Sequence, residues 1–228
     1  MIHLSVETST DILGMALLDD DKVLGEVSLR MVRGASEVLS PALDILLLGR
    51  EMPVGRIERI SCSAGPGSYT SLRVGFLFSK GLSQSLGVPL TVLSPFETLA
   101  RQYRDGSLED LLVVLNARQG QVTAGLFHRE PITGILFLDP EFGRAPSLDQ
   151  GLQAMRPSSV IALLPDVPLR VVGPGRAILD PCIPEGRNWI RKEGEDLPPR
   201  ASVQGILAWE RRNLPVDEVG LVYGRAPV

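Results

Sequence analysis

The sequence is poor in the residues from which several kinds of site are built. It holds two cysteines and two histidines among 228 residues, and none of them stands at the spacing of metal ligands. This argues against a disulfide framework and against a zinc hydrolase, and both thiols are expected to be buried in a reducing compartment. Aromatic residues make up 5% of the chain, so the core must be aliphatic and base stacking is not its main use.

The chain also has no excess of positive charge. The formal net charge is −4 and the sequence pI is near 5.3, which argues against a dedicated nucleic-acid binder. Arginine supplies nearly all of the basic residues, but the arginines are scattered along the chain. The N-terminus lacks a basic region followed by a long apolar run, and Glu7 and Asp11 interrupt the apolar pattern. We therefore expect a soluble, cytoplasmic protein without a signal peptide or membrane span.

The first half of the chain reads as alternating strands and helices. Its hydrophobic pattern predicts a three-stranded meander, then a helix, a strand, a glycine-rich turn, a second helix, a strand and a third helix. Ser94-Pro95-Phe96-Glu97 has the pattern of a capping box at the start of that third helix. The expected ranges are strands 2–6, 13–18, 23–29, 57–63 and 90–93, the turn 65–70, and helices 38–48, 71–86 and 95–103.

A second domain is expected to begin after residue 103, because residues 104–110 are polar and contain glycine. The two domains are thus 1–103 and 104–228, and the last helix or strand is a candidate to return to the first. No internal repeat is visible in the sequence. The second half is predicted to hold strands 111–115, 121–127 and 132–138, apolar runs 160–164 and 170–172, irregular chain over 180–199, a helix 201–212 and a strand 219–223.

Two polar segments are candidates for anion binding. The loop 65–70 connects a strand to a helix, so its backbone N–H groups and hydroxyls could bind a phosphate. Glu7-Thr8-Ser9-Thr10 places one carboxylate and three hydroxyls at the end of the first strand, as in a clamp for a metal-bound phosphate. In each case the alternative is purely structural: glycines that make a turn, a serine that caps a helix, and hydroxyls that satisfy the backbone.

Other catalytic patterns are not met. The loop is not a P-loop, because the nearest lysine, Lys80, lies well inside the following helix. No Gly-x-Ser-x-Gly occurs, and Ser68 has no candidate base nearby in sequence.

The helix 71–86 is unusually apolar. Arg73 and Lys80 are its charged residues, and its large apolar side chains spread around much of the circumference. Gly75, Ser79 and Ser83 form a ridge of small residues that would let another helix approach closely. The helix 38–48 is also apolar on more than one face. Either the protein's own second domain covers these helices or they form a subunit interface.

Several of these segments together resemble the bacterial TsaB (YeaZ) family of tRNA threonylcarbamoyladenosine biosynthesis proteins. The resemblance is dense in the first half of the chain and thin in the rest. The glycine-rich run is shared with the wider group that includes the catalytic partner TsaD. The segments are 4–10, the step 39–41 in the first helix, 64–75, 80–82, 86–89, 94–100 and 116–122.

The resemblance implies an α/β fold, the actin-like (ASKHA, RNase H-like) architecture of two lobes with a reduced second lobe. It also implies a non-catalytic scaffold, because the His-x-x-x-His metal pair that TsaD-like members carry on the first helix is absent from residues 35–48. Such a scaffold would pair with a TsaD-like subunit, be joined by a TsaE-like ATPase, form a homodimer when the partner is absent, and meet tRNA only through the complex. No cofactor and no metal are expected.

The sequence departs from the usual family pattern at three polar positions. Glu7 stands where Asp is usual, Gly34-Ala35-Ser36 replaces a common His-Ser, and Asn116 replaces an Asp. These departures weaken the alternative reading, in which the chain is an ATP-dependent phosphotransferase or a peptidase-like enzyme.

Two sets of candidate residues follow. Residues expected to bind the partner are Val38, Leu39, Ala42, Leu43, Leu46, Leu72, Gly75, Phe76, Phe78, Ser79, Leu82 and Ser83. Residues of a vestigial phosphate loop are Glu7, Thr8, Ser9, Gly65, Gly67, Ser68 and Thr70.

Overall fold

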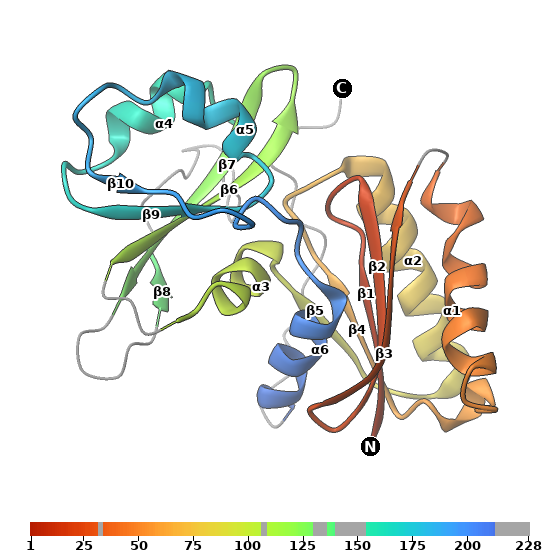
Figure 1. Cartoon of the computed structure of the whole chain (residues 1–228). Helices are drawn as coiled ribbons and strands as arrows, with labels where there is room; N and C mark the ends of the chain where they lie inside the picture. Colours follow the sequence, from red (N-terminus) through yellow and green to blue (C-terminus); the bar gives the residue numbers. More distant parts are fainter. Residues whose placement is uncertain (32–33, 106–108, 130–135, 140–153, 213–228) are drawn as a thin grey trace. The chain divides into compact units, whose positions relative to one another are not determined.

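In the computed structural model the chain divides into two units (Figure 1). The structure describes residues 1–31, 34–105, 109–129, 136–139 and 154–212. The first unit comprises Met1–Thr98 and the segment that begins at Pro199, and the second comprises Leu99–Pro198. The division at Thr98 lies inside α3 (Pro95–Gln102), slightly before the boundary expected from the sequence.

The first unit is built on a mixed five-stranded sheet with the order β3-β2-β1-β4-β5. The first three strands form an antiparallel meander, and β4 and β5 add to β1 in parallel. The strands are β1 (Ile2–Glu7), β2 (Ile12–Asp19), β3 (Lys22–Arg30), β4 (Arg59–Ser63) and β5 (Leu90–Leu93), with the short 3-10 helices η1 (Ala35–Glu37) and η2 (Val54–Arg56) between β3 and β4.

Helices cover both faces of this sheet (Figure 1). On one face lie α1 (Leu39–Leu48) and α2 (Tyr69–Leu86), and on the other lies α6 (Ala201–Glu210), which comes from the far end of the described sequence. Glu26 of β3 fixes the start of α6, because its carboxylate accepts hydrogen bonds from the backbone N–H and the hydroxyl of Ser202 at 2.9 and 2.8 Å.

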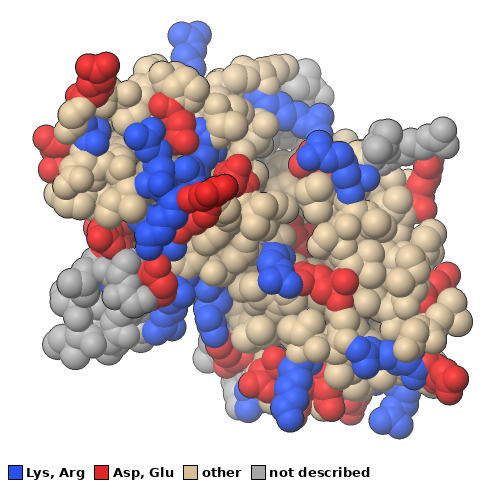
Figure 2. All heavy atoms as spheres, in the orientation of Figure 1, with Lys and Arg blue, Asp and Glu red and all other residues tan. Residues whose placement is uncertain are grey.

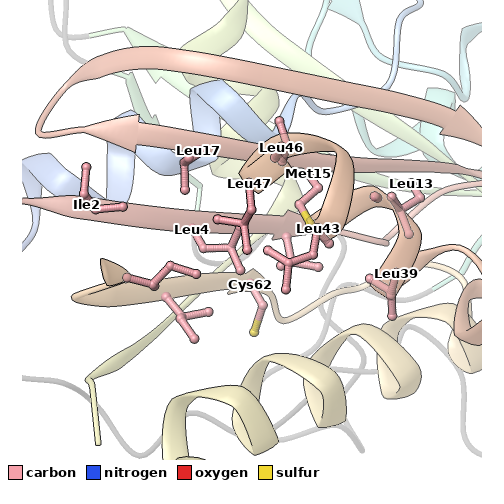
Figure 3. Close-up of a cluster of buried hydrophobic side chains, with 14 of the residues drawn as sticks. Ile2, Leu4, Leu13, Met15, Leu17, Leu39, Leu43, Leu46, Leu47 and Cys62 are labelled. Carbon is pink, nitrogen blue, oxygen red and sulfur yellow. The ribbon is translucent and has the colours of Figure 1, made fainter. Parts of the chain in front are cut away.

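The main core lies between the sheet and α1 and α2 (Figure 3). Strand residues alternate between the two faces of a sheet, so every second residue of β1 and β2 points to these helices. Leu39, Leu43, Leu46 and Leu47 of α1 meet them at helical spacing, and these side chains are buried. The labelled core residues are Ile2, Leu4, Leu13, Met15, Leu17, Leu39, Leu43, Leu46, Leu47 and Cys62.

The second unit repeats the strand order of the first. Its sheet has the order β10-β9-β6-β7-β8, again an antiparallel meander extended by two parallel strands. This repetition was not visible in the sequence. The elements are β6 (Asp110–Arg118), β7 (Gln121–Arg129), β8 (Leu136–Leu138), α4 (Pro157–Leu163), β9 (Leu169–Val172), α5 (Arg176–Leu179), η3 (Asp180–Cys182) and β10 (Trp189–Ile190).

Most of the expected elements are present, with some corrections. The helix expected to start at Ser71 begins at Tyr69, the apolar run 160–164 lies largely in α4, and 170–172 lies in β9. Ser94 does cap α3, since its hydroxyl accepts the N–H of Phe96 at 3.2 Å. The expectations for strand residues 132–135 and 219–223 lie outside the described residues.

Two side-chain expectations need correction. Glu97, expected to complete the capping box, instead accepts a hydrogen bond from Arg211 at 2.8 Å. The competing partner is a guanidinium at the end of α6, and a charged donor is stronger than a backbone N–H. Of the two cysteines, Cys62 is buried as expected, but Cys182 is exposed.

Candidate functional site

The two polar segments singled out in the sequence meet in the first unit. The backbone N–H of Ser68, at the start of α2, donates to the carbonyl oxygen of Ser9 at 2.7 Å. The hydroxyl of Ser63, at the end of β4, accepts the N–H of Thr8 at 3.1 Å. The turn after β1 is therefore held by the ends of β4 and the glycine-rich loop.

This contact leaves no room between the segments. A Cβ atom on Gly67 would overlap the carbonyl oxygen of Ser9, and one on Gly75 would overlap the Thr8 hydroxyl. Glycine is required at both positions because the turn after β1 lies directly against the loop and α2. The Ser68 N–H, which a phosphate at this loop would use, is already bound to the Ser9 carbonyl, and the phosphate loop stays a prediction.

Glu7 is the carboxylate of this group, and it is fully buried. One carboxyl oxygen accepts the N–H of Ser9 at 2.6 Å. Burial raises the pKa of Glu7 from 4.5 to about 7, an effect partly opposed by the hydrogen bonds from Ser9 and Ser63. Burial therefore disfavours the charged form of this carboxyl group. In the described part of the chain, no cluster of three His, Cys, Asp or Glu side chains could hold a metal ion.

Glu7 belongs to a polar layer beneath α6 that we did not predict. The imidazole Nε2 of His3 lies 2.9 Å from the hydroxyl oxygen of Ser61, and the amide of Gln204 donates to the Ser5 hydroxyl at 3.0 Å. All of these side chains are buried. The signal in the sequence was the strict alternation of apolar and polar residues over 2–7 and 59–63, which shows that one face of the sheet is polar.

The first half of the predicted partner-binding set lies inward on α1. Leu39, Ala42, Leu43 and Leu46 are buried in the core of the first unit, and Val38 is half-buried against it. The apolar side chains that α1 exposes are two others, Ile45 (57% exposed) and Leu48 (76%).

The ridge of small residues on α2 also faces the chain itself. Gly75 packs on Thr8, Ser79 is buried, and the Ser83 hydroxyl donates to the carbonyl of Val88 at 2.6 Å. The ridge is thus already used to bring α2 close to its own strands, where the sequence analysis expected another helix. Leu72 is buried with it, whereas Phe76, Phe78 and Leu82 are half-buried.

The side of α2 away from the sheet carries an apolar strip, in which Leu77 and Gly81 are exposed and Val74 and Phe78 are half-buried. We call Val74, Leu77, Phe78 and Gly81 the outer strip; they stand at positions i, i+3, i+4 and i+7, which share one face of a helix. Leu77 is 62% exposed, and a Cβ on Gly81 would meet nothing within 4 Å. Of the residues of this helix that were predicted to bind the partner, Phe78 lies in the outer strip and the others do not, because an all-round apolar pattern does not tell which side faces the sheet.

Charged side chains form no single-sign surface on the side of the protein drawn in Figure 2. Lysine and arginine alternate with aspartate and glutamate, in keeping with the net charge of −4. None of the helices described is both long and apolar enough to cross a membrane.

The chain is similar in sequence to proteins of tRNA threonylcarbamoyladenosine biosynthesis. Residues 22–131, just under half of the chain, match the family model of TsaD, the tRNA N6-adenosine threonylcarbamoyltransferase. The tRNA threonylcarbamoyladenosine biosynthesis protein TsaB of Bacillus subtilis is 36% identical over 129 residues, which are 56% of this chain and 55% of that protein. The protein of the same name from Escherichia coli is 26% identical over 128 residues, covering 56% and 55%. The chain spans about half the length of the curated relatives it matches.

The fold is shared over the whole length of known structures. YeaZ from Pseudomonas aeruginosa superposes with a TM-score of 0.74 over 97% of this chain and 99% of that chain, at 21% sequence identity. A second structure, a protein with similarity to peptidase YeaZ from the same organism, gives a TM-score of 0.73 at 22% identity and covers 98% and 99%. The actin-like α/β fold expected from the resemblance is confirmed. With the matches to the Bacillus and Escherichia proteins, these findings show that the chain is similar to TsaB (YeaZ) proteins in the sequence of its first half and in its fold.

Proposed function

We propose that this chain is a non-catalytic subunit of the machinery that installs a threonylcarbamoyl group on an adenosine of tRNA next to the anticodon. In this role it binds and supports a TsaD-like catalytic subunit. The contact is made by the outer strip of α2, together with the exposed apolar side chains of α1.

The observation that carries this proposal is the outer strip itself. A helix on the surface of an isolated domain normally shows polar residues on the side away from the core. Here Leu77 stands at the middle of that side, and half-buried Val74 and Phe78 flank it. Exposed Gly81 weakens the helix by about 1 kcal/mol relative to alanine, with no packing reason within the described chain. A closely approaching partner helix explains both the apolar surface and the glycine.

The contact between the turn after β1 and the glycine-rich loop favours a non-catalytic role over an enzymatic one. The residues that would bind a phosphate are in contact with each other, and the buried carboxyl group of Glu7 has its charged form disfavoured. An ATP-dependent phosphotransferase or a peptidase needs an open, preorganised site at this point.

The remaining components of the complex follow from this role. A net charge of −4 and interleaved charges favour contact with tRNA through the complex rather than by this chain alone. A TsaE-like ATPase would join the pair. Because one apolar surface can pack on its own copy by two-fold symmetry, we expect a homodimer when the TsaD-like subunit is absent. Its place of action would be the cytoplasm, where tRNA is modified.

A single substitution tests the contact. Leu77→Asp places a charge at the centre of the outer strip, where a buried unpaired carboxylate is strongly unfavourable in a complex but not in the free chain. We expect binding to the TsaD-like protein of the same organism, measured by calorimetry, to weaken at least about a hundredfold, or about 3 kcal/mol. Circular dichroism should show an unchanged fold.

The matched control is Leu163→Asp on α4, a leucine that is 58% exposed on a helix of the second unit. It should leave binding unchanged. If Leu77→Asp binds as tightly as the control, the outer strip is not the contact. If neither wild type nor control binds the partner or increases its transfer activity, the proposed role is refuted.

A further inference from the structure

The C-terminal end of α1 borders an apolar hollow with two acidic residues at its rim. The hollow has a volume of about 360 Å³, and it is open to solvent because most of the residues around it are exposed. Its apolar part combines a buried leucine, an exposed leucine and a half-buried methionine. We call it the α1 hollow; the residues that line it are Asp44, Leu47, Leu48, Glu51, Met52 and Pro53.

The two carboxylates at the rim have no counter-ion. In the part of the chain that the structure describes, the side chains of Asp44 and Glu51 make no ion pair and no hydrogen bond. The basic residue next to them in the chain, Arg50, points elsewhere: a guanidinium nitrogen lies 3.9 Å from the place where a Cβ of Gly25 in β3 would stand. Two negative charges therefore stand beside exposed apolar surface without compensation.

Glu51 also goes against the local preferences of a helix end. The C-terminal end of a helix carries a partial negative charge, so basic residues are favoured there, yet α1 has none in its last turn. Glu51 closes this end, because its backbone N–H donates to the carbonyl of Leu48 at 3.2 Å. Its φ of 50° is left-handed, a conformation for which glycine or asparagine is usual at this position. Neither its charge nor its backbone conformation stabilises the free chain.

The shape and the charge of the α1 hollow suit one long basic side chain. Arginine and lysine carry an apolar stem that lies along apolar surface while the charged head stays at a polar rim. Here the stem would pack on Leu47 and Met52, and the head would lie between Asp44 and Glu51. A purely apolar side chain would instead remove water from two carboxylates without replacing it by a counter-charge, and an acidic one would be repelled.

We propose that the α1 hollow binds an arginine or lysine side chain of the TsaD-like subunit. The hollow is continuous with the contact proposed above, because Leu48 is one of the exposed apolar residues of α1 and stands four residues after Asp44, on the same face of the helix. The inference rests on the proposed function, and it adds the charge of the partner residue that meets this end of α1.

The test neutralises both carboxylates of the full chain at nearly constant size, by Asp44→Asn together with Glu51→Gln. Affinity for the TsaD-like protein of the same organism, measured by calorimetry, should fall at least about thirtyfold, because a basic side chain at the contact loses its counter-charges. The decrease of affinity with added salt should become less steep. The matched control is Asp21→Asn together with Glu185→Gln, two exposed carboxylates elsewhere, which changes the net charge equally and should bind like wild type.

Two further measurements identify the partner residue and exclude a merely structural role. Arginines and lysines of the TsaD-like subunit are replaced one at a time by glutamine, and one replacement should lose at least about tenfold of its effect when the two carboxylates are absent. The free double variant should melt about 1–3 °C higher than wild type, because a negative charge is removed from the end of α1. A structural role of the carboxylates would lower the melting temperature instead.

The outcomes separate this inference from the proposed function. If wild type does not bind the TsaD-like subunit, both fail. If wild type binds and Leu77→Asp does not, but the double variant binds as tightly as its control, this inference alone is overturned. It is also overturned if no basic residue of the partner couples to the carboxylates, or if the double variant weakens only the self-association of the chain, which would place the basic residue in a second copy.

Discussion

The two faces of the first sheet are built from opposite kinds of residue. Toward α1 and α2, β1 presents Ile2, Leu4 and Val6, and toward α6 it presents His3, Ser5 and Glu7. All six are buried, so both faces are covered, but the interactions that cover them differ. The first face is stabilised by apolar area. The second carries hydrogen bonds such as that from Gln204 to Ser5, and in the described structure it leaves Glu7 Oε2 and His3 Nδ1 buried without a hydrogen-bond partner.

The difference between the apolar and the polar face of the sheet affects which surface can bind a partner. Apolar burial is not directional and needs no specific partner for each group, so α2 can cover the sheet with one side and still expose Leu77 on the other. The polar face is more demanding, because each buried polar group without a partner is costly. It is covered by α6, a helix from the far end of the described sequence.

Substitutions at two adjacent residues of β1, Leu4 and Ser5, compare the stability of the two faces, and they have the largest expected effect. Leu4→Ala creates a cavity in the apolar core and should lower the free energy of unfolding by about 2–5 kcal/mol. Ser5→Ala removes one acceptor of the Gln204 amide, which keeps the Val6 carbonyl at 3.1 Å, and should cost only about 1 kcal/mol. Urea denaturation of both variants measures the two values. Equal losses would mean that the polar layer is as well packed as the apolar one.

The pH dependence of stability probes the polar face alone. Burial raises the pKa of Glu7 to about 7, while the unfolded chain ionises near 4.5. The contribution of Glu7 is therefore complete below about pH 4.5 and is lost as the pH rises to about 7, an effect of at most about 3 kcal/mol. Urea denaturation at a series of pH values should show that Glu7→Gln lacks this loss.

His3 changes stability in the opposite direction, and the same experiment must allow for it. Burial, together with the charge of Arg59, lowers the pKa of His3 to about 3, so its contribution is lost as the pH falls from 6.5 toward 3. The difference between wild type and Glu7→Gln isolates Glu7, because both proteins keep His3. A difference that does not vary with pH would show that Glu7 is charged in the folded chain.

The sequence predicted the fold well where periodicity is strong. The first meander, the position of α1 and the cap of α3 at Ser94 follow from local pattern and turn residues, which depend on neighbours in the chain. The candidate loops could also be predicted to lie near each other, since Glu7 and Gly65 follow neighbouring parallel strands.

The tertiary contacts of the candidate residues could not be predicted from local pattern. That the Ser68 N–H binds Ser9 rather than a ligand depends on a tertiary contact between segments almost sixty residues apart. The side of α2 that faces the sheet was ambiguous because apolar residues surround the helix. The salt bridge of Glu97 with Arg211 joins residues more than a hundred apart, and no local rule anticipates it.

The smallest effect concerns the two glycines of α2, which stand on different sides of one helix. Gly75 is fixed by its contact with Thr8, whereas Gly81 has open space around the position of a Cβ. Gly81→Ala should therefore raise the free energy of unfolding of the free chain by about 1 kcal/mol, because alanine restricts the unfolded backbone and favours the helix. If a partner helix approaches at Gly81, the added methyl group must weaken the complex. The stability of the free chain would then rise while its affinity for the TsaD-like subunit falls. Thermal unfolding of the free chain and calorimetry with the TsaD-like subunit measure both, and an affinity that does not fall would place the partner elsewhere on the outer strip.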